Sequence, residues 1–260
     1  MELGLEGKTA AVSGASWGIG YAIARGLAEE GVRVAISVRG RDRLEKAARE
    51  IAEATGTEVH AVQADLASAQ GCDAFIQEAV DRLGKLDVLV NNVGGLLRGT
   101  VESFQDEGWQ QMLDWGLLSH IRCTRAAIPH LNDGGRVVNL SGLSGKQYGP
   151  GGLTTGVVNS GVIAFSKYLA GELAPRNILV NNICPGFIYT ESWNERVQKM
   201  AADQGKDPEE VKKGFVERTL LGRWGEPREI ADVVVFLASE RGSFITGETI
   251  IVGGGRDLFI

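Results

Sequence analysis

The chain has few of the side chains that usually bind transition metals. Its 260 residues include only three cysteines and three histidines. The cysteines, Cys72, Cys123 and Cys184, lie far apart, and neither they nor the histidines show the spacing of a zinc or iron–sulfur site. We therefore expect no metal centre, and three buried thiols in a reducing compartment are the simpler interpretation.

Clusters of positive charge and long apolar runs are also missing. The formal net charge is -6, and no group of lysines and arginines is placed to follow a phosphate backbone or an anionic membrane surface. No apolar run approaches the length of a membrane span. Residues 1–6 are acidic where a signal peptide would be basic. We therefore expect a cytoplasmic protein with neither nucleic-acid nor membrane partners.

What the chain does have is a regular alternation of two patterns. With 43% hydrophobic and 23% charged residues it can bury one substantial core. Runs rich in Val, Ile and Ala, typical of strands buried on both faces, occur at residues 9–12, 32–38, 58–63, 88–91, 136–140, 178–183 and 249–252. Helical patterns lie between them, at residues 19–30, 43–55, 70–84, 104–131, 154–174 and 227–238. The alternation predicts one α/β domain over residues 1–260, a doubly wound parallel sheet with helices on both faces.

One segment breaks this rhythm. Residues 190–223 are polar, helical in composition and contain Trp193. An excursion of this length near the carboxyl ends of the strands is typical of a loop that covers a ligand. We expect a substrate loop or lid here.

Glycines at positions 14, 18 and 20 follow the first predicted strand, and a helical pattern begins among them. Glycine permits the tight turn and lets backbone N–H groups approach a pyrophosphate, whose charge the amino end of a helix favours. By itself such a turn also fits an ordinary strand–helix connection, because the chain contains 36 glycines. Its position between the first strand and the first helix favours a Rossmann-like dinucleotide site.

Further motifs follow the later strands in a fixed order. They are Asp65-Leu66, Asn91-Asn92-Val93-Gly94, Pro185-Gly186-Phe187-Ile188-Tyr189-Thr190, and Gly225-Glu226-Pro227 followed by Ile245-Thr246-Gly247. Together with the glycine turn they resemble the classical type of the short-chain dehydrogenase/reductase family over nearly the whole chain. The resemblance implies an oxidoreductase that uses a nicotinamide dinucleotide.

The resemblance also implies where that cofactor would bind. Ser16 and Ile19 would lie near the phosphates, residues 65 and 66 at the adenine, residues 92 and 94 along the ribose, and residues 185–190 at the nicotinamide amide. The expected cofactor-binding residues are Gly14, Ser16, Trp17, Gly18, Ile19, Gly20, Arg39, Asp65, Leu66, Asn92, Val93, Gly94, Pro185, Gly186, Ile188 and Thr190.

Arg39 indicates which dinucleotide is preferred. Val38 stands where NAD-preferring relatives carry an acid for the ribose hydroxyls, and Arg39 follows at once. A guanidinium can form charge-assisted hydrogen bonds to a 2′-phosphate, so we expect NADP(H) to be preferred over NAD(H). The alternative is a solvated arginine grouped with Arg41 and Arg43.

The same resemblance implies a catalytic tetrad of Asn, Ser, Tyr and Lys, which this chain lacks. Residues 136–140 and 164–167 align it with the family pattern without a gap, so that the Ser, Tyr and Lys positions carry Gly142, Thr155 and Asn159. By the pattern around Trp109 and Met112, the Asn position carries Gly116. None of the four tyrosines has a lysine four residues later, so the loss does not depend on the local alignment.

These replacements change both chemistry and volume. Positioned general acid–base catalysis contributes about 10²–10⁴-fold, so we expect tetrad-based activity to be weak or absent. The space would be filled by a larger ligand, by water, or by Trp115, Tyr148 or Trp193. Replacement proton donors could come from the loop that follows residue 140, and the candidates are Tyr148, Lys146, Ser141 and Ser144, each of which could equally be an ordinary loop residue.

Three functions remain open at this stage. The first is an NADP(H)-dependent oxidoreductase that acts on a carbonyl or alcohol group of a small molecule through a non-standard proton donor. The second is a non-catalytic NADP(H) sensor or the silent partner subunit of an active homologue, and the third is a non-redox lyase or isomerase. In the family the helices that correspond to residues 104–131 and 154–174 form subunit contacts, so we expect a homodimer or homotetramer, or a hetero-oligomer with an active homologue.

Overall fold

Seven parallel strands form the centre of the protein. The structure is a computed structural model that describes residues 2–95, 97, 99–149 and 151–256. The strands are β1 (Thr9–Ser13), β2 (Arg33–Val38), β3 (Val59–Gln63), β4 (Leu86–Asn91), β5 (Leu131–Leu140), β6 (Leu179–Pro185) and β7 (Thr249–Val252). Their order in the sheet is β3-β2-β1-β4-β5-β6-β7, and every neighbouring pair is parallel. The predicted Rossmann-like, doubly wound architecture in a single domain is confirmed.

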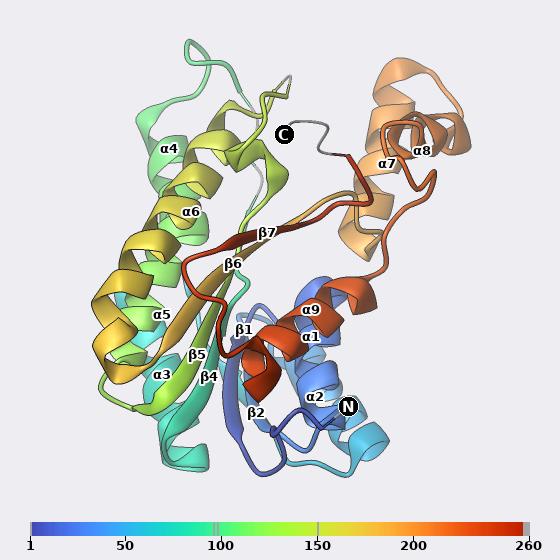
Figure 1. Ribbon diagram of the computed structural model, residues 1–260. Coiled ribbons are helices and arrows are strands. Elements are labelled where there is room, and N and C mark those ends of the chain that lie inside the picture. The colour runs from blue at the N-terminus through green and yellow to red at the C-terminus, as the bar shows by residue number, and fades with distance from the viewer. Residues whose placement is uncertain (1, 96, 98, 150, 257–260) are drawn as a thin grey trace.

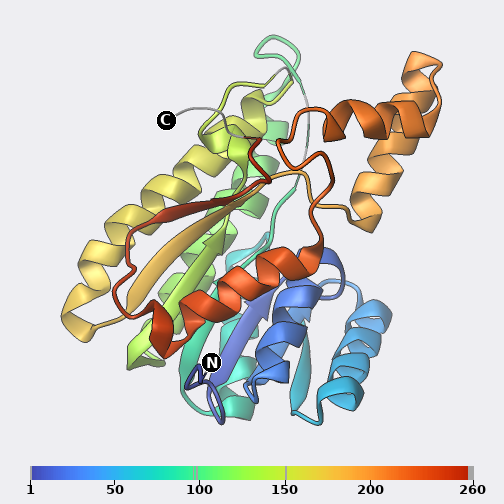
Figure 2. The ribbon, with the colours of Figure 1, turned by 45° about the vertical axis from the view of Figure 1, so that its right-hand side comes forward.

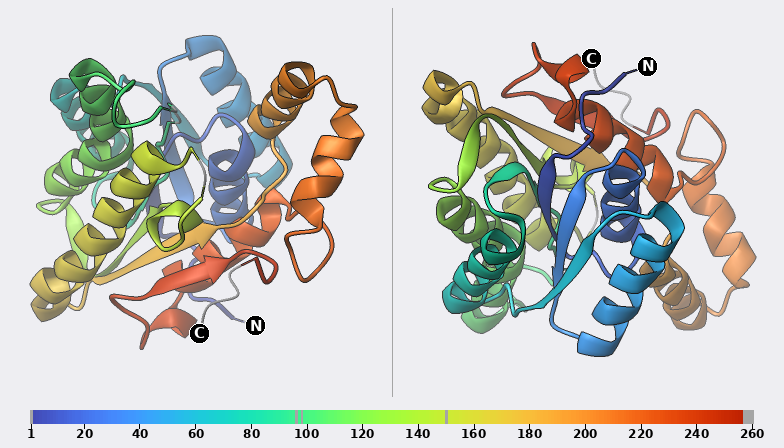
Figure 3. Two further views of the ribbon diagram at one scale, coloured as in Figure 1. Left: turned by 90° about the horizontal axis from the view of Figure 1, so that it is seen from above. Right: turned by 90° about the horizontal axis from the view of Figure 1, so that it is seen from below.

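Helices cover both faces of this sheet (Figure 1 and Figure 2). One face packs against α1 (Gly18–Glu29), α2 (Arg41–Thr55) and α9 (Pro227–Ala238). The other face packs against α3 (Ala69–Leu83), α5 (Ser119–Ala127) and α6 (Leu153–Leu173). Figure 3 shows the two helical layers on either side of the sheet. Because both faces are covered, the inner strands are mostly buried, as their composition predicts, whereas the edge strands β3 and β7 are mostly half-buried.

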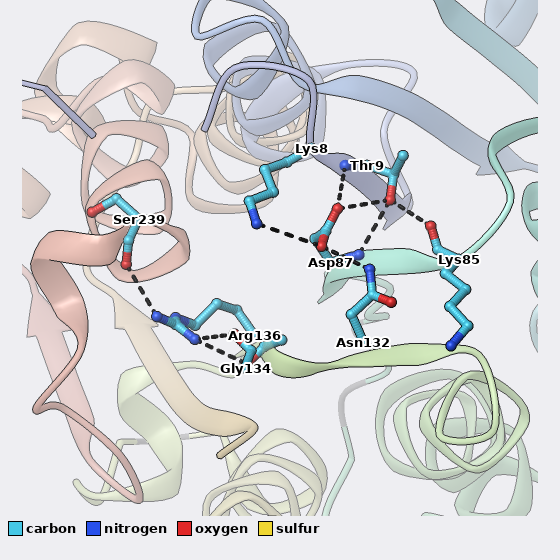
Figure 4. Close-up of polar contacts among 9 residues, drawn as sticks. Lys8, Thr9, Lys85, Asp87, Asn132, Gly134, Arg136 and Ser239 are labelled. Atoms are coloured by element: carbon cyan, nitrogen blue, oxygen red, sulfur yellow. Dashed lines mark hydrogen bonds and ion pairs between the residues drawn. The ribbon is translucent and has the colours of Figure 1, made fainter. Parts of the chain in front are cut away.

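A hydrogen-bonded carboxylate fastens the amino ends of three strands (Figure 4). Asp87, near the start of β4, accepts a hydrogen bond from the backbone N–H of Thr9 at 2.9 Å. Its other oxygen accepts one from Asn132 Nδ2 of β5, also at 2.9 Å. These contacts lie at the amino ends of the strands, at the opposite end of the sheet from the carboxyl ends, and we assign them a structural role.

The helix predicted over residues 104–131 differs from the one observed. The structure has α4 (Asp106–Leu113), one π-helical turn over Asp114–Leu118, and α5. β5 begins already at Leu131, which pairs with Leu86, so residues 131–135 are strand rather than helix end and loop. The π turn widens the helix at Gly116. Such turns inside helices are common at functional sites.

The segment that we expect to act as a lid forms α7 (Glu191–Gln204) and α8 (Pro208–Val216). Both stand beyond the carboxyl ends of the strands, at the upper right of Figure 1. Among the described residues, no helix is long and apolar enough to cross a membrane.

Candidate functional site

A cleft of about 390 Å³ opens at the carboxyl ends of β1 and β4. The strand order reverses here, because β3 lies at one edge of the sheet and the chain returns to β4 beside β1. Open α/β sheets bind ligands at such a point. The expected cofactor-binding residues that line the cleft are Gly14, Trp17, Gly18, Ile19, Gly20, Arg39, Asp65, Leu66, Asn92, Val93, Gly94 and Thr190.

Four other expected residues lie outside this cleft. Pro185 lines a neighbouring cavity. Ser16 is 8% exposed and lines neither cavity. Gly186 and Ile188 also line neither cavity. Gly186 lies against Gly253, since a Cβ at Gly186 would come within 2.6 Å of Gly253 Cα. The Ile188 backbone pairs with Gly225.

The cleft also has lining residues that the motifs do not include. They are Val38, Ala64, Ala67, Gly95, Trp115 and Ser192. Most of them adjoin a motif residue in the chain. Trp115 does not adjoin a motif residue, and it reaches the cleft from the π turn. Its ring packs closely on Gly95, because a Cβ at Gly95 would lie 2.4 Å from Trp115 Cε3. No local signal in the sequence indicates this contact.

The glycine turn is shaped by close backbone contacts. Gly14 and Gly18 have φ values of 66° and 59°, which glycine adopts without strain. A Cβ at Gly20 would lie 2.2 Å from the carbonyl oxygen of Gly14. Asn92 Nδ2 donates to that same oxygen at 3.0 Å and ties the turn to the end of β4. No side chain within the described ranges caps the amino end of α1, so its first N–H groups can serve an anionic ligand.

The three arginines after β2 occupy different places. Arg41 donates to Gln63 Oε1 at 3.0 Å. The Arg43 guanidinium carbon lies 5.7 Å from the centroid of the Trp17 ring, and Arg43 also approaches Glu191 at 3.9 Å. Arg39 lines the cleft. All three arginines are exposed, and of the three only Arg39 lines the cleft.

A second cavity of about 300 Å³ adjoins the cleft. The two share several lining residues, which are Ile19, Asn92, Val93, Gly94 and Gly95. Gly116, Thr155 and Asn159 line the second cavity, and Gly142 lies beside it, since a Cβ there would be 2.9 Å from Asn159 Nδ2. The structure thus brings all four of these positions together. No tyrosine or lysine of the described chain lines this cavity.

The polar groups around the second cavity are partly engaged. Thr155 Oγ1 donates to the carbonyl oxygen of Gly152 at 3.1 Å. Asn159 Nδ2 donates to Ser144 Oγ at 2.8 Å. Ser141 lines the cavity. Its hydroxyl accepts from Asn182 Nδ2 at 2.9 Å, lies 3.1 Å from Cys184 Sγ and donates to the Ile183 carbonyl oxygen at 3.5 Å. These groups can orient a ligand by hydrogen bonding, but none has the acidity of a phenol or the charge of an ammonium.

Of the four candidate donors, only Ser141 lines the second cavity. Tyr148 is 95% exposed and, like Lys146 and Ser144, lines a separate outer hollow.

Beside Gly116 the structure places an aliphatic side chain and none of the expected aromatic residues. A Cβ at Gly116 would lie 2.4 Å from Cγ1 of Val158, so this α6 side chain occupies the space. Trp115 packs on Gly95 instead, and Trp193 packs against Phe215 of α8. Val158 lies one helical turn after Thr155 in α6. Sequence spacing alone does not show which side chains of two helices face each other, so the sequence did not indicate its contact with Gly116.

Buried hydrogen bonds join the strands β4 and β5 to the helices α5 and α6 next to the second cavity. Asn91 Nδ2 of β4 donates to Asn139 Oδ1 of β5 at 2.8 Å and to Thr124 Oγ1 of α5 at 3.0 Å. Asn139 Nδ2 donates in turn to Ser166 Oγ of α6 at 2.9 Å. These hydrogen bonds connect the sheet to α5 and α6 and hold their members in one geometry. Asn91 Oδ1 is the one oxygen of the network that is buried without a partner among the described residues.

A buried histidine holds the loop after β4. His120 Nε2 lies 3.0 Å from the carbonyl oxygen of Val93, a residue that lines both cavities. Burial lowers the pKa of His120 to about 4, because the charged imidazolium would lose its hydration. His120 is therefore neutral at pH 7 and donates this hydrogen bond.

Aromatic rings anchor α7 and α8, the segment that we expect to act as a lid. Phe187, Trp193, Phe215 and Trp224 form a compact cluster, which we call the lid cluster. The centroid of Trp193 lies 5.2 Å from those of Phe215 and Trp224 and 5.7 Å from that of Phe187. The lid cluster joins α7 and α8 to the turn after β6. Edge-to-face pairs at these distances add stabilisation beyond their buried area.

Comparison with known proteins gives concordant matches. A family model described as enoyl-(acyl carrier protein) reductase matches residues 14–257. The chain is 38% identical over 251 residues to an uncharacterized oxidoreductase of Methylorubrum extorquens, covering 96% of this chain and 98% of that one. It is 36% identical over 250 residues to a 3-oxoacyl-[acyl-carrier-protein] reductase of Staphylococcus aureus, covering 95% and 97%.

Solved structures are similar over the same extent. The L-sorbose reductase of Gluconobacter frateurii, complexed with NADPH and L-sorbose, has a TM-score of 0.95 at 33% identity and covers 100% of both chains. A short-chain dehydrogenase/reductase from Serratia marcescens has a TM-score of 0.87 at 33% identity, covering 97% of this chain and 98% of that one. The sheet order, the glycine turn and these matches agree, and the chain belongs to the short-chain dehydrogenase/reductase family.

Proposed function

We propose that the protein is an NADP(H)-dependent oxidoreductase that acts on a carbonyl or alcohol group of a small molecule. The observation that carries this proposal is the continuity of the two cavities, from Arg39 at one end, past the glycine turn, to Thr155 and Asn159 at the other. An extended dinucleotide needs such a continuous path. The relatives named as reductases, one of them in complex with NADPH, support the same class of activity.

The residues of the cleft fit this cofactor. The close approach of Gly20 to the Gly14 carbonyl oxygen, which a side chain would prevent, keeps the turn tight so that backbone N–H groups can approach a pyrophosphate. The uncapped amino end of α1 favours its charge. Arg39 would hold the 2′-phosphate and Asp65 would hold the adenine. When bound, the dinucleotide supplies or accepts a hydride.

The polar residues of the second cavity would orient the substrate. We propose that Ser141 exchanges its long hydrogen bond to the Ile183 carbonyl oxygen for one to the substrate oxygen, because it is the candidate donor that lines this cavity. An aliphatic hydroxyl is a much weaker acid than the tyrosine of the family pattern. Turnover should therefore be slower than that of a tetrad enzyme by about 10²–10⁴-fold.

Titration with both nucleotides tests the cofactor assignment. We expect NADPH to bind more tightly than NADH, and Arg39→Ala to weaken NADPH by about tenfold or more while leaving NADH unchanged, since a hydrogen bond to a charged group contributes about 1.5–3 kcal/mol. Arg41→Ala is the matched control, because Arg41 is engaged with Gln63. Equal affinities of the wild type for the two nucleotides would reject the assignment.

The donor is tested with NADPH and a panel of simple ketones. Ser141→Ala should abolish the residual turnover, whereas Tyr148→Phe should leave it unchanged, because Tyr148 is 95% exposed and lines another hollow. Loss of turnover in Tyr148→Phe alone would assign the proton to Tyr148 and reject our choice.

A second candidate function is a non-catalytic NADP(H)-binding subunit, a sensor or the silent partner of an active homologue. It is favoured by the cavity lining, which contains neither a tyrosine nor a lysine within the described ranges. Tight NADPH binding without turnover of any ketone or alcohol would support it. Co-purification with an active homologue would then assign the role of a partner subunit.

A further inference from the structure

Arg196 brings a positive charge to the second cavity. It is the one charged residue among the described residues that line this cavity, and no acidic residue lines it. The other polar lining residues are uncharged; they are Asn92, Ser141, Thr155 and Asn159. A cation in a partly enclosed space interacts more strongly with an anion than one on an open surface, because less water screens it.

The lid holds Arg196 in place. Arg196 belongs to α7, and its guanidinium carbon lies 5.3 Å from the centroid of the Trp193 ring. Trp193 is itself a member of the lid cluster. The aromatic face therefore supports the guanidinium plane, and less side-chain entropy is lost when a ligand binds.

We infer that the substrate carries an anionic oxygen group, a carboxylate in its simplest form, which Arg196 binds. This inference rests on the proposed function, because it describes the substrate of the same site. A guanidinium presents two parallel N–H groups that match a carboxylate, and such pairs are among the strongest hydrogen bonds in proteins. A cavity of about 300 Å³ limits the ligand to a small molecule.

The cofactor phosphates are another source of negative charge. Arg196 lines the second cavity and does not line the cleft that contains the glycine turn and the amino end of α1, where we expect the cofactor phosphates. We therefore assign the anion to the substrate. The two sources are separable by experiment, because a phosphate contact would change NADPH affinity in the absence of any substrate.

The test compares two probes that share the 4-oxopentanoyl group, 4-oxopentanoate and its uncharged methyl ester. Each is titrated into the NADPH complex and into the free protein by calorimetry, with the wild type and with the R196Q, R196K and K199Q variants. K199Q removes one positive charge from the exposed side of the same helix and serves as the control. Nucleotide titrations of all four proteins are made in parallel.

We expect the wild type to bind the acid at least about tenfold more tightly than the ester. R196Q should lose this preference, R196K should keep part of it, and K199Q should keep all of it. Equal binding of acid and ester by the wild type would overturn the inference, and so would equal losses in R196Q and K199Q. A weaker affinity of R196Q for NADPH alone would reassign Arg196 to a cofactor phosphate. If the wild type fails to bind NADPH, the proposed function fails, and the free-protein titration still decides whether Arg196 selects the carboxylate.

Discussion

The two glycines beside the second cavity are each in close contact with a side chain of α6. Gly116 faces Val158, and Gly142 faces Asn159. A side chain introduced at one of these glycines would therefore meet the residue that lies beside it. We expect changes at these positions to require matching changes in their neighbours.

Gly116 should tolerate a side chain only when Val158 is shortened. A Cβ at position 116 would lie 2.4 Å from Val158 Cγ1, and overpacking of this kind typically costs about 1–3 kcal/mol. We expect Gly116→Asn to lower the free energy of unfolding by that amount in urea denaturation. Adding Val158→Ala should recover most of the loss. A single Gly116→Asn variant as stable as the wild type would show that the helices move apart freely.

Restored activity should require the complete set of catalytic residues. We expect Thr155→Tyr alone to leave ketone reduction unchanged, because its phenol would lack a neighbouring ammonium to lower its pKa. Combining it with Gly142→Ser, Asn159→Lys, and Gly116→Asn in a Val158→Ala background should raise the rate measurably. Circular dichroism and NADPH affinity check that the variants fold. No gain in a folded, cofactor-binding variant would mean that these four positions are not the vacated tetrad.

At the scale of elements, α5 holds the loop after β4 through His120. The pKa of this buried imidazole is about 4, below its ordinary value of 6.5. Between these two values the unfolded chain binds more protons than the folded one, so stability is lost as the pH falls through this window. The same loop lines both cavities, which links its order to ligand binding.

The free energy of unfolding should fall by about 2 kcal/mol between pH 7 and pH 5 because of His120, since each unit of pKa difference corresponds to 1.36 kcal/mol. His120→Gln cannot become charged and should flatten the dependence by that amount. Urea denaturation at both pH values measures it, with His130→Gln as the control. An unchanged slope in His120→Gln would contradict the assignment of a neutral, buried imidazole.

The amino ends of the strands depend on Asp87 (Figure 4). Asp87→Ala removes the acceptor for both Thr9 N–H and Asn132 Nδ2. Each partly buried donor left without a partner costs about 1–3 kcal/mol. We expect a loss of at least about 2 kcal/mol in unfolding free energy, with little change in NADPH affinity, because the cleft lies at the other end of the sheet. A large loss of NADPH affinity would contradict this separation.

At the scale of the molecule, α6 carries more apolar surface than one sheet can cover. Its buried face includes Val158 and Leu169, yet Val157 is 48% exposed and Tyr168 is 83% exposed. Exposed apolar surface along a helix is typical of a subunit contact. We therefore expect α6 to pack against a second copy of the chain.

Light scattering should report a dimer or a tetramer, a multiple of the 27.8 kDa chain, at micromolar concentration. Val157→Glu combined with Tyr168→Glu should shift the mass toward that of the monomer, because two carboxylates would be buried in the contact. Tyr148→Glu, on an exposed loop, is the control. A monomeric wild type would reject α6 as a subunit contact.

Local patterns in the sequence determine much of this protein. Apolar runs and the helical period predict the parallel sheet, and the spacing of glycines 14, 18 and 20 predicts the turn where the cleft forms. Each of these features depends on residues that are close together in the chain. Only the tertiary structure shows that Val158 fills the space at Gly116, that Ser141 rather than Tyr148 lines the second cavity, and that Arg196 brings a charge into it. These contacts join elements far apart in the chain, and their geometry is set by how helices and loops pack on the sheet, which no local period records.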